Sequence, residues 1–430
     1  MTHASIEITP VRGPLDASIR PPGSKSLTNR ALVCAALARG TSTLSGALDS
    51  DDTRVMIDAL SKLGIGVEVD LAARTLTVTG CAGQIPAQAA ELYVANSGTT
   101  VRFLTALVAL GQGTFRLDGS ARMRERPIQD LLDALAQCGI DARSTSGSGC
   151  PPVEIRASGL TGGHVQMRGD VSSQFLSGLL LAAPYARAAL NIDVSGQLVS
   201  QPYVLMTLAV MESFGVSVPA GDLSQLQIAA PRCYKSRAYE IEPDASAASY
   251  FWAAAAIAGG RVTVAGLGQG SLQGDVAFCH CLEMMGCRVE YHAGETTVIG
   301  GPLRGIDVDM NAISDTVQTL APVALFAQGP TNIRGVAHIR HKETDRIAAV
   351  ATELRKFGAV VEERADGLRI TPPAKVYGAT IETYDDHRMA MGMALVGLRT
   401  AGVVINDPLC TAKTYPGFFA DLASLQNSPA

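Results

Sequence analysis

One pattern of about 72 residues returns six times along this chain of 430 residues. Each copy opens with a polar turn, continues into a helix of small apolar residues, and then gives a break and a β-branched strand. Near-equal spacing indicates repeated supersecondary units rather than the loose recurrence of any α/β protein. The copies open, at intervals of 71, 75, 72, 70 and 71 residues, at Ser26, Ser97, Ser172, Asp244, Ser314 and Asp385.

A second helix follows in each copy, and in five copies it ends at a glycine before a strand. Glycine suits the residue after a helix because it adopts positive φ without steric cost. Helices as apolar all round as FWAAAAIAGG are expected to be buried. We therefore expect three units to form an α/β domain in which sheets surround buried helices. The five glycines are Gly64, Gly139, Gly215, Gly286 and Gly358.

Six units divide naturally into three plus three, and the chain exceeds the roughly 250–300 residues that one hydrophobic core supports. We predict one domain from residues 22–242, with repeats 1–3, and a second from residues 243–430, with repeats 4–6. The initial strand, within residues 1–21, is expected to join the second domain. Prolines flag two chain crossings, where we expect a hinge, at Pro21, Pro22 and Pro243.

Composition excludes several classes of partner. The net charge is −5 and the pI is about 5.8, so no overall positive field would attract nucleic acid or an anionic membrane. The start of the chain does not resemble a secretion signal, and no run of about 18 apolar residues is present, which makes the cytoplasm the expected compartment. Nine cysteines, an odd number, are typical of reduced thiols.

The residues also argue against a metal site. Cys279, Cys281 and Cys287 lie near His280, but their spacing matches no paired zinc-ligand pattern. The segment FCHCLEMMGC instead predicts an amphipathic helix. His387 lacks a second ligand at suitable spacing, so no metal site is predicted.

Positive charge is local, because the cations concentrate in the turns before the helices. A helix N-terminus offers unpaired N–H groups and about half a positive charge, which makes it a ready anion site. If the helices of a domain stack in parallel, several N-termini would point into one cleft. The cations in these turns are Lys25, Arg30, Arg102, Arg122, Arg124, Arg126, Arg340, Lys342, Arg346, Arg388 and Lys413.

Phosphoryl transfer from ATP has little support. The segment PPGSKS lacks the spacing of a nucleoside triphosphate-binding loop, since Ser24 separates Gly23 from Lys25. No plausible pair of Mg²⁺-binding carboxylates adjoins it. The acid-base candidates are the carboxylates among the cations, Asp315 and Glu343.

Ten ordered segments match a known family: GSKSLTNRA, LDSDDT, NSGTTVR, RMRERPI, SSQFLSGLL, LVSQPY, DASAASYF, KETDR, YDDHRMAM and TAKTYP. On these segments the chain resembles, over essentially its whole length, the 5-enolpyruvylshikimate-3-phosphate synthase family of enolpyruvyl transferases. The resemblance implies an α/β fold of two domains, each of three βαβαββ units with buried parallel helices, and an active site in the cleft between them. It further implies transfer of the enolpyruvyl group of phosphoenolpyruvate to the 5-hydroxyl of shikimate 3-phosphate. This reaction releases inorganic phosphate through a tetrahedral intermediate, with no metal or cofactor, in a monomer.

The resemblance also implies site residues at matching positions. Shikimate 3-phosphate is expected to bind Lys25, Ser26, Arg30, Ser172, Ser173, Gln174, Ser200, Asp315, His338 and Lys342. Phosphoenolpyruvate is expected to bind Lys25, Gly98, Arg126, Gln174, Arg346, Arg388 and Lys413. The hypothetical catalytic groups are Asp315, for the proton of the 5-hydroxyl, and Glu343 with Lys25, for proton transfer at C3.

Two alternatives stay open. A related enolpyruvyl transferase acts on a UDP-sugar and typically carries a reactive cysteine on a loop, but residues 111–127 hold none. A non-catalytic anion-binding relative would gain nothing from Asp315 and Glu343 beside its anions. The chain departs from the family pattern at Ser97, Thr100 and Phe103, and at His338, where many relatives have an asparagine.

Overall fold

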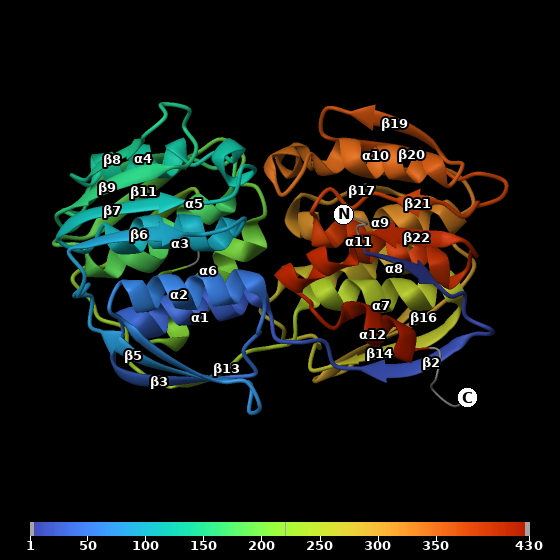
Figure 1. The fold of residues 1–430 in the computed structure, drawn as a ribbon, viewed down its shortest axis with the longest axis horizontal. Coiled ribbons are helices and arrows are strands. Elements are labelled where there is room, and N and C mark those ends of the chain that lie inside the picture. The colour runs from blue at the N-terminus through green and yellow to red at the C-terminus, as the bar shows by residue number, and fades with distance from the viewer. Residues whose placement is uncertain (1–3, 220, 426–430) are drawn as a thin grey trace. The chain divides into compact units, whose positions relative to one another are not determined.

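The computed structural model describes residues 4–219 and 221–425, and the chain divides into two units (Figure 1). The central unit is Gly23–Ile241, and the terminal unit combines the chain up to Pro22 with everything from Glu242 onward. Within the described residues, each unit contains three sheets and six α-helices. The sixfold repeat of the sequence is therefore visible as six sheets.

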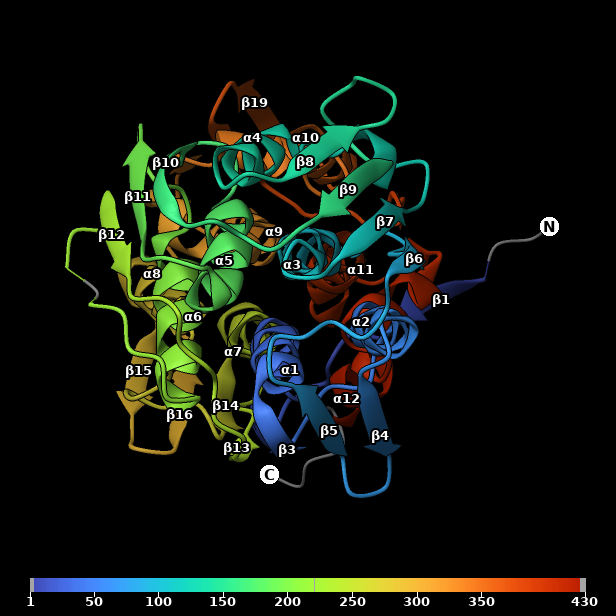
Figure 2. The ribbon, with the colours of Figure 1, turned by 90° about the vertical axis from the view of Figure 1, so that its left-hand side faces the viewer.

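The central unit places its sheets around the buried helices α1 (Lys25–Leu37), α3 (Gly98–Val108) and α5 (Ser173–Ala182) (Figure 2). The strands of its first sheet are, in order, β13 (Ala238–Glu240), β3 (Arg39–Ser45), β5 (Thr75–Cys81) and β4 (Gly66–Asp70). Those of the second are β6 (Ala89–Tyr93), β7 (Gly113–Asp118), β9 (Val153–Ala157) and β8 (Asp141–Ser144). Those of the third are β10 (Gly163–Arg168), β11 (Leu190–Ser195) and β12 (Gln225–Ile228). The helices are α1 (Lys25–Leu37), α2 (Asp51–Lys62), α3 (Gly98–Val108), α4 (Gln129–Gln137), α5 (Ser173–Ala182) and α6 (Gln201–Ser213), with short 3-10 turns η1 (Met123–Glu125) and η2 (Ala183–Tyr185).

The terminal unit repeats this plan. The strands of its first sheet are, in order, β15 (Arg288–Tyr291), β16 (Glu295–Ile299), β14 (Gly260–Ala265) and β2 (Leu15–Ile19). Those of the second are β17 (Asp307–Asp309), β18 (Thr331–Arg334), β20 (Gly367–Thr371) and β19 (Val360–Arg364). Those of the third are β1 (Ser5–Ile8), β22 (Val403–Asn406) and β21 (Thr380–Ile381). Its helices are α7 (Ala245–Ala258), α8 (Phe278–Met285), α9 (Val317–Val323), α10 (Arg346–Lys356), α11 (His387–Ala394) and α12 (Phe418–Ser424). The 3-10 turns are η3 (Gly274–Ala277), η4 (Asn311–Thr316), η5 (Ala324–Phe326), η6 (Ala337–His341), η7 (Leu395–Leu398) and η8 (Pro408–Lys413).

Two strands sit in a different unit from the helix that follows them in the chain. Strand β2 precedes α1 but pairs in parallel with β14 of the terminal unit. Strand β13 precedes α7 but pairs in parallel with β3 of the central unit. Both strands are followed by proline, at Pro21–Pro22 and at Pro243. Proline has no N–H to donate to a ladder, so it suits the residue at which the chain leaves one sheet.

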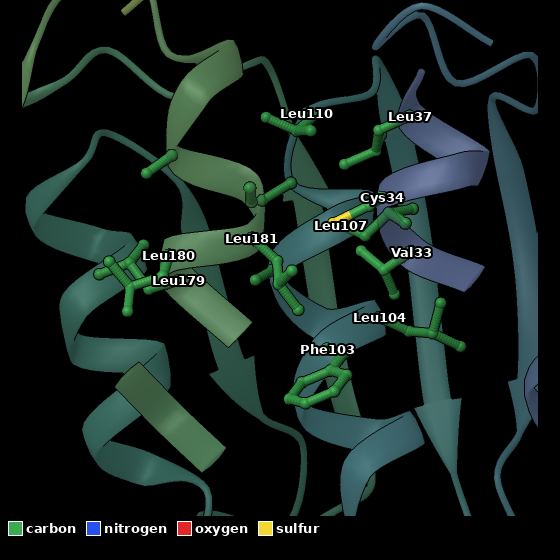
Figure 3. Packing of buried hydrophobic residues seen from close by; sticks show 14 of the residues in the cluster. Val33, Cys34, Leu37, Phe103, Leu104, Leu107, Leu110, Leu179, Leu180 and Leu181 are labelled. Atoms are coloured by element: carbon green, nitrogen blue, oxygen red, sulfur yellow. The ribbon is translucent and has the colours of Figure 1, made fainter. Parts of the chain in front are cut away.

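The first helix of each repeat forms the core. In α1 every residue from Leu27 to Leu37 is buried, and in α3 the whole span is buried. Figure 3 shows Val33, Cys34 and Leu37 of α1 beside Leu104 and Leu107 of α3. Such helices have no solvent face, so their polar residues gather at the ends.

Glycine permits the closest contacts between these helices. A Cβ on Gly178 of α5 would lie 2.8 Å from the carbonyl oxygen of Arg102 in α3. In the terminal unit, a Cβ on Gly392 of α11 would lie 2.1 Å from the carbonyl oxygen of Gln318 in α9. The two units thus use glycine for the same helix–helix approach.

Most predicted elements are present, with local differences. All five glycines after the second helices have positive φ, between 80° and 112°, as predicted. The copy that opens at Ser314 begins in the 3-10 turn η4, and its helix α9 follows at Val317. The segment 342–345 is not helical; it precedes α10, and Asp345 caps that helix.

The predicted amphipathic helix at the cysteines is α8, which buries Phe278, Cys279, Cys281, Leu282 and Met285. Among residues 4–219 and 221–425, no group of three or more His, Cys, Asp or Glu side chains is placed to hold a metal ion. Nor does this part of the chain contain a helix long and apolar enough to span a membrane.

Replacing Gly392 with alanine is expected to destabilise the protein. Alanine improves helix propensity by about 1 kcal/mol, whereas overpacking costs about 1–3 kcal/mol. The clash is with backbone, which cannot rotate away, so we expect the free energy of unfolding in urea to fall by about 1–2 kcal/mol. Gly13→Ala is the control, because nothing lies within 4 Å of its added Cβ. Equal losses in both variants would contradict the packing argument.

Candidate active site

The first polar cluster of the central unit lies where α1, α2 and α3 begin. Lys25 is the first residue of α1, and its Nζ lies 3.5 Å from Oδ2 of Asp52 in the first turn of α2. The hydroxyl of Thr100 donates to the carbonyl of Asp52 at 3.4 Å, and Asn29 donates to the hydroxyl of Thr99 at 2.7 Å. These contacts tie Lys25 to the start of α3.

Two guanidinium groups cover the first residue of α3. A Cβ on Gly98 would lie 2.5 Å from Nη2 of Arg126 and 2.7 Å from Nη1 of Arg102. Arg126 donates to the carbonyl and side-chain oxygens of Asn96 at 2.9 and 3.0 Å. Arg102 donates to the carbonyl of Gly98 at 3.2 Å and to Oε1 of Gln174 at 3.4 Å. A helix N-terminus and two buried cations therefore meet at Gly98, an arrangement that suits an anion.

Arg30 is a further cation of the central unit and is buried. Its Nε donates to the hydroxyl of Thr207 at 2.7 Å, and its Nη1 donates to the carbonyl of Ser26 at 3.0 Å. Its Nη2 donates to the carbonyl of Tyr203 at 3.0 Å and to the hydroxyl of Ser177 at 3.5 Å. Burial lowers the pKa of Arg30 to about 10, so it stays charged at neutral pH. These four bonds leave at most one of its five N–H groups for a ligand.

The predicted serines lie at helix starts. Ser172 caps α5 and accepts from the N–H of Gln174 at 3.3 Å, and Ser173 is the first residue of that helix. Ser200 precedes α6 with a φ of 51°. Hydroxyl groups and backbone N–H groups at these positions suit phosphate oxygens.

Arg346 is the centre of the polar cluster in the terminal unit. It is the first residue of α10, and only 2% of its surface is exposed. Its Nε lies 2.8 Å from Asp386, its Nη2 lies 2.8 Å from Glu343, and its Nη1 lies 3.2 Å from Asp315. Burial by itself would lower the pKa of Arg346, but these three carboxylates outweigh it and raise the pKa.

The two candidate acids lie among four cations. Asp315 accepts from Lys342 at 3.3 Å, from Arg346, and from Nη2 of Arg388 at 2.8 Å. Glu343 pairs with Arg346, and the Nζ of Lys413 lies 3.9 Å from its Oε1. Burial lowers the pKa of Lys342. Carboxylates held this way can exchange protons with a ligand while the cations bind its negative charge.

His338 acts as a neutral group. Its Nε2 lies 3.0 Å from the hydroxyl of Ser314, and burial lowers its pKa to about 3. The imidazole is therefore uncharged at physiological pH and offers hydrogen bonding rather than positive charge.

Three of the cations in the predicted turns pair with acidic side chains near them in the sequence. Arg122 pairs with Glu125, Arg124 pairs with Asp118, and Arg340 pairs with Asp345, at 2.8, 2.7 and 2.8 Å. Each of these arginines thus has an acidic partner close to it along the chain.

Three charged residues of the clusters were not assigned to a substrate or to catalysis from the sequence. Asp52 and Asp386 are the buried partners of Lys25 and Arg346, and Arg102 links Gly98 to Gln174. All three lie in segments that matched the family. Sequence alone could not distinguish a buried carboxylate from the exposed one beside it, as at Asp51 and Asp52 or Asp385 and Asp386.

Comparisons with known sequences agree on one family. A family model described as EPSP synthase (3-phosphoshikimate 1-carboxyvinyltransferase) matches residues 10–422. A relative named 3-phosphoshikimate 1-carboxyvinyltransferase, from Nostoc sp. strain PCC 7120, is 50% identical over 416 residues, covering 96% of this chain and 98% of the relative. A relative of the same name from Shewanella sp. strain MR-7 is 48% identical over 421 residues, covering 97% and 98%.

Solved structures share the fold. EPSP synthase from Acinetobacter baumannii matches with a TM-score of 0.81 at 26% identity, covering 98% of this chain and 97% of that one. An enolpyruvyl transferase from Streptomyces tendae has a TM-score of 0.79 at 21% identity, covering 98% of both chains. The predicted two-domain enolpyruvyl-transferase fold is thus confirmed. By sequence and by structure, the chain belongs to the EPSP synthase (3-phosphoshikimate 1-carboxyvinyltransferase) family.

Proposed function

We propose that this chain transfers the enolpyruvyl group of phosphoenolpyruvate to the 5-hydroxyl of shikimate 3-phosphate and releases inorganic phosphate. One observation carries the proposal beyond family membership: Asp315 and Glu343 each lie within ion-pair distance of at least two largely buried cations. A protein that only bound anions would gain nothing from these acids. A reaction that moves two protons needs such groups.

We assign phosphoenolpyruvate to the groups that suit its charge and shape. Arg346 and Arg388 suit a planar carboxylate because a guanidinium fork matches its geometry, whereas Lys25 and Lys413 act on phosphate as point charges. The N-terminus of α3 at Gly98, with Arg126, adds phosphate donors, and Gln174 adds a neutral donor.

Shikimate 3-phosphate is assigned to the neutral and basic groups at the starts of α1, α5 and α6. Its phosphate carries about −1.5 to −2 charges at pH 7. Helix N-termini and hydroxyls suit this group without enclosing a surplus of positive charge. The set is Ser26, Arg30, Ser172, Ser173, Gln174 and Ser200, joined by Lys25, Asp315, His338 and Lys342 of the predicted site.

The reaction requires one addition and one elimination. Asp315 accepts the proton of the 5-hydroxyl as that oxygen bonds to C2 of phosphoenolpyruvate, and C3 gains a proton from Glu343 or Lys25. In the elimination, Glu343 or Lys25 takes a proton back from C3 as the bond between C2 and the phosphate oxygen breaks, and the departing phosphate takes up the proton held by Asp315. Products are 5-enolpyruvylshikimate 3-phosphate and inorganic phosphate. Aligning two bound reactants supplies several kcal/mol of the barrier, of the order of 7 or more in favourable cases.

Binding of the substrate carboxylate would also activate the base. Arg346 and Arg388 both donate to Asp315. A second carboxylate that shares these two guanidinium groups loosens their hold on Asp315. The affinity of Asp315 for a proton then rises, because nearby positive charge no longer favours its ionised form as strongly.

The proposal includes the remaining expectations from the sequence. The groups of both units act on one pair of substrates, with domain boundaries before residues 22 and 243. The chain works as a monomer in the cytoplasm and uses no metal or cofactor.

Phosphate release tests the activity directly. We expect release only when phosphoenolpyruvate and shikimate 3-phosphate are both present, and none when UDP-N-acetylglucosamine replaces the acceptor. Release that stops on addition of a divalent-metal chelator would contradict the proposal.

The two acids can be tested by isosteric amides. Asp315→Asn and Glu343→Gln are each expected to lower kcat at least about a hundredfold, the usual scale for a general acid or base. Glu290→Gln, which removes an exposed carboxylate paired with Arg288, is the control and should leave kcat unchanged. Near-normal turnover in either site variant would remove that residue from the scheme.

Gly98→Ala tests the assignment of phosphoenolpyruvate to the start of α3. The added methyl would displace Arg126 and Arg102, which lie 2.5 and 2.7 Å from its position. We expect the KM for phosphoenolpyruvate to rise about tenfold or more, with a smaller change in the KM for shikimate 3-phosphate. Gly221→Ala, whose Cβ meets nothing within 4 Å, is the control. An unchanged KM for phosphoenolpyruvate would place that substrate elsewhere.

A further inference from the structure

The turn before α11 holds an unusual backbone conformation. Tyr384 and Asp385 are consecutive non-glycine residues with φ of 57° and 53°. L-residues disfavour this region, so such a pair persists only where surrounding contacts hold it. Within the turn, the N–H of Asp386 donates to the carbonyl of Thr383 at 2.9 Å.

This turn sets the position of two residues of the candidate active site. Asp386 follows it directly, caps α11 by accepting from the N–H of Arg388 at 2.9 Å, and pairs with Arg346. Arg388 is the second residue of α11 and donates to Asp315. A shift of the turn would therefore move the partner of Arg346 and the guanidinium of Arg388 together.

A buried carboxylate in α10 forms hydrogen bonds with the turn. The side chain of Glu353 is fully buried, and its Oε1 accepts from the hydroxyl of Tyr384 at 2.7 Å. Its Oε2 accepts from the N–H of Glu382 at 3.1 Å and pairs with Lys356 at 2.7 Å. Burial and the bond to Glu353 raise the pKa of Tyr384, which keeps its hydroxyl protonated as a donor at neutral pH.

Helix α10 thus bonds to the turn and to the residue after it through two side chains. Arg346, its first residue, binds Asp386 after the turn, and Glu353 binds Glu382 and Tyr384 within it. Positions seven residues apart lie on the same face of a helix, two turns along the axis. One rigid element therefore fixes both the arginine and the turn that carries its partner.

We propose that Glu353 is a positioning residue for the reaction: by bonding Glu382 and Tyr384 it holds the left-handed turn that aligns Asp386 and Arg388 with Arg346. It touches no substrate. When these hydrogen bonds are lost, the turn relaxes toward ordinary backbone angles. Arg346 and Arg388 are then no longer aligned to bind the same carboxylate. The inference rests on the proposed function only for the identity of the substrates.

Two variants and a matched control test the proposal. Glu353→Gln keeps the size of the side chain but puts an amide NH₂ where one of the two acceptors stood, and Tyr384→Phe removes a single bond at a side chain that is 40% exposed. We expect the KM for phosphoenolpyruvate to rise about tenfold in Glu353→Gln and by a smaller factor in Tyr384→Phe. The dissociation constant of shikimate 3-phosphate alone, measured by calorimetry, should change less than about twofold, because its assigned partners lie mostly in the central unit. Hydrogen exchange at the amide of Asp386 should become faster in both variants.

Glu283→Gln is the control, because Glu283 of α8 also accepts from a tyrosine, Tyr291, at 3.2 Å and lies in the same unit. It should leave both constants and the exchange rate unchanged. An inactive wild-type chain would refute the proposed function instead. An active wild type with an unchanged KM for phosphoenolpyruvate in both Glu353→Gln and Tyr384→Phe would overturn the role of Glu353. If Glu353→Gln does not fold, the result for Tyr384→Phe decides.

Discussion

Burial of the first helix of every repeat is the constraint on which the rest of the structure depends. A helix enclosed on all sides can carry a charged side chain only where other groups bond to it, because an unpaired charge would be buried without water. In α1, α3 and α5 most polar residues lie in the first half of the helix, and the apolar remainder packs in the core. The sheets around these helices make this burial possible, and Gly178 and Gly392 let neighbouring helices approach closely enough to complete it.

The two units hold their most buried arginines in different ways. In the central unit, Arg30 is held by carbonyl and hydroxyl oxygens. In the terminal unit, Arg346 is held by three carboxylates. Neutral partners leave the charge of a cation uncompensated for an incoming anion, whereas carboxylates compensate it and also provide groups that exchange protons. This difference supports assigning binding of phosphate mainly to the central unit and acid-base chemistry to the terminal unit.

Helix α10 both supplies a residue of the candidate active site and supports the turn that carries the partner of that residue. Its first residue is Arg346, its cap is Asp345, and its buried face carries Glu353. The rigidity of a packed helix passes from the core to the turn at Tyr384 and Asp385, whose backbone would otherwise relax. Precise placement of catalytic groups commonly depends on such supporting contacts beneath them.

The sequence by itself determined the repeat, the family and the type of chemistry. Six evenly spaced copies and five glycines after helices reflect local rules of backbone conformation, which act within a few residues and can be read along the chain. Tertiary structure alone decided which charges matter. In the structure Asp52 is buried, whereas Asp51 is exposed. Arg126 bonds to Asn96, whereas Arg124 pairs with Asp118 at the surface. Glu353, which lies in no motif, bonds to Tyr384. Burial and pairing depend on residues far apart in the chain, so neighbouring residues of one type can have opposite roles for reasons that no local pattern contains.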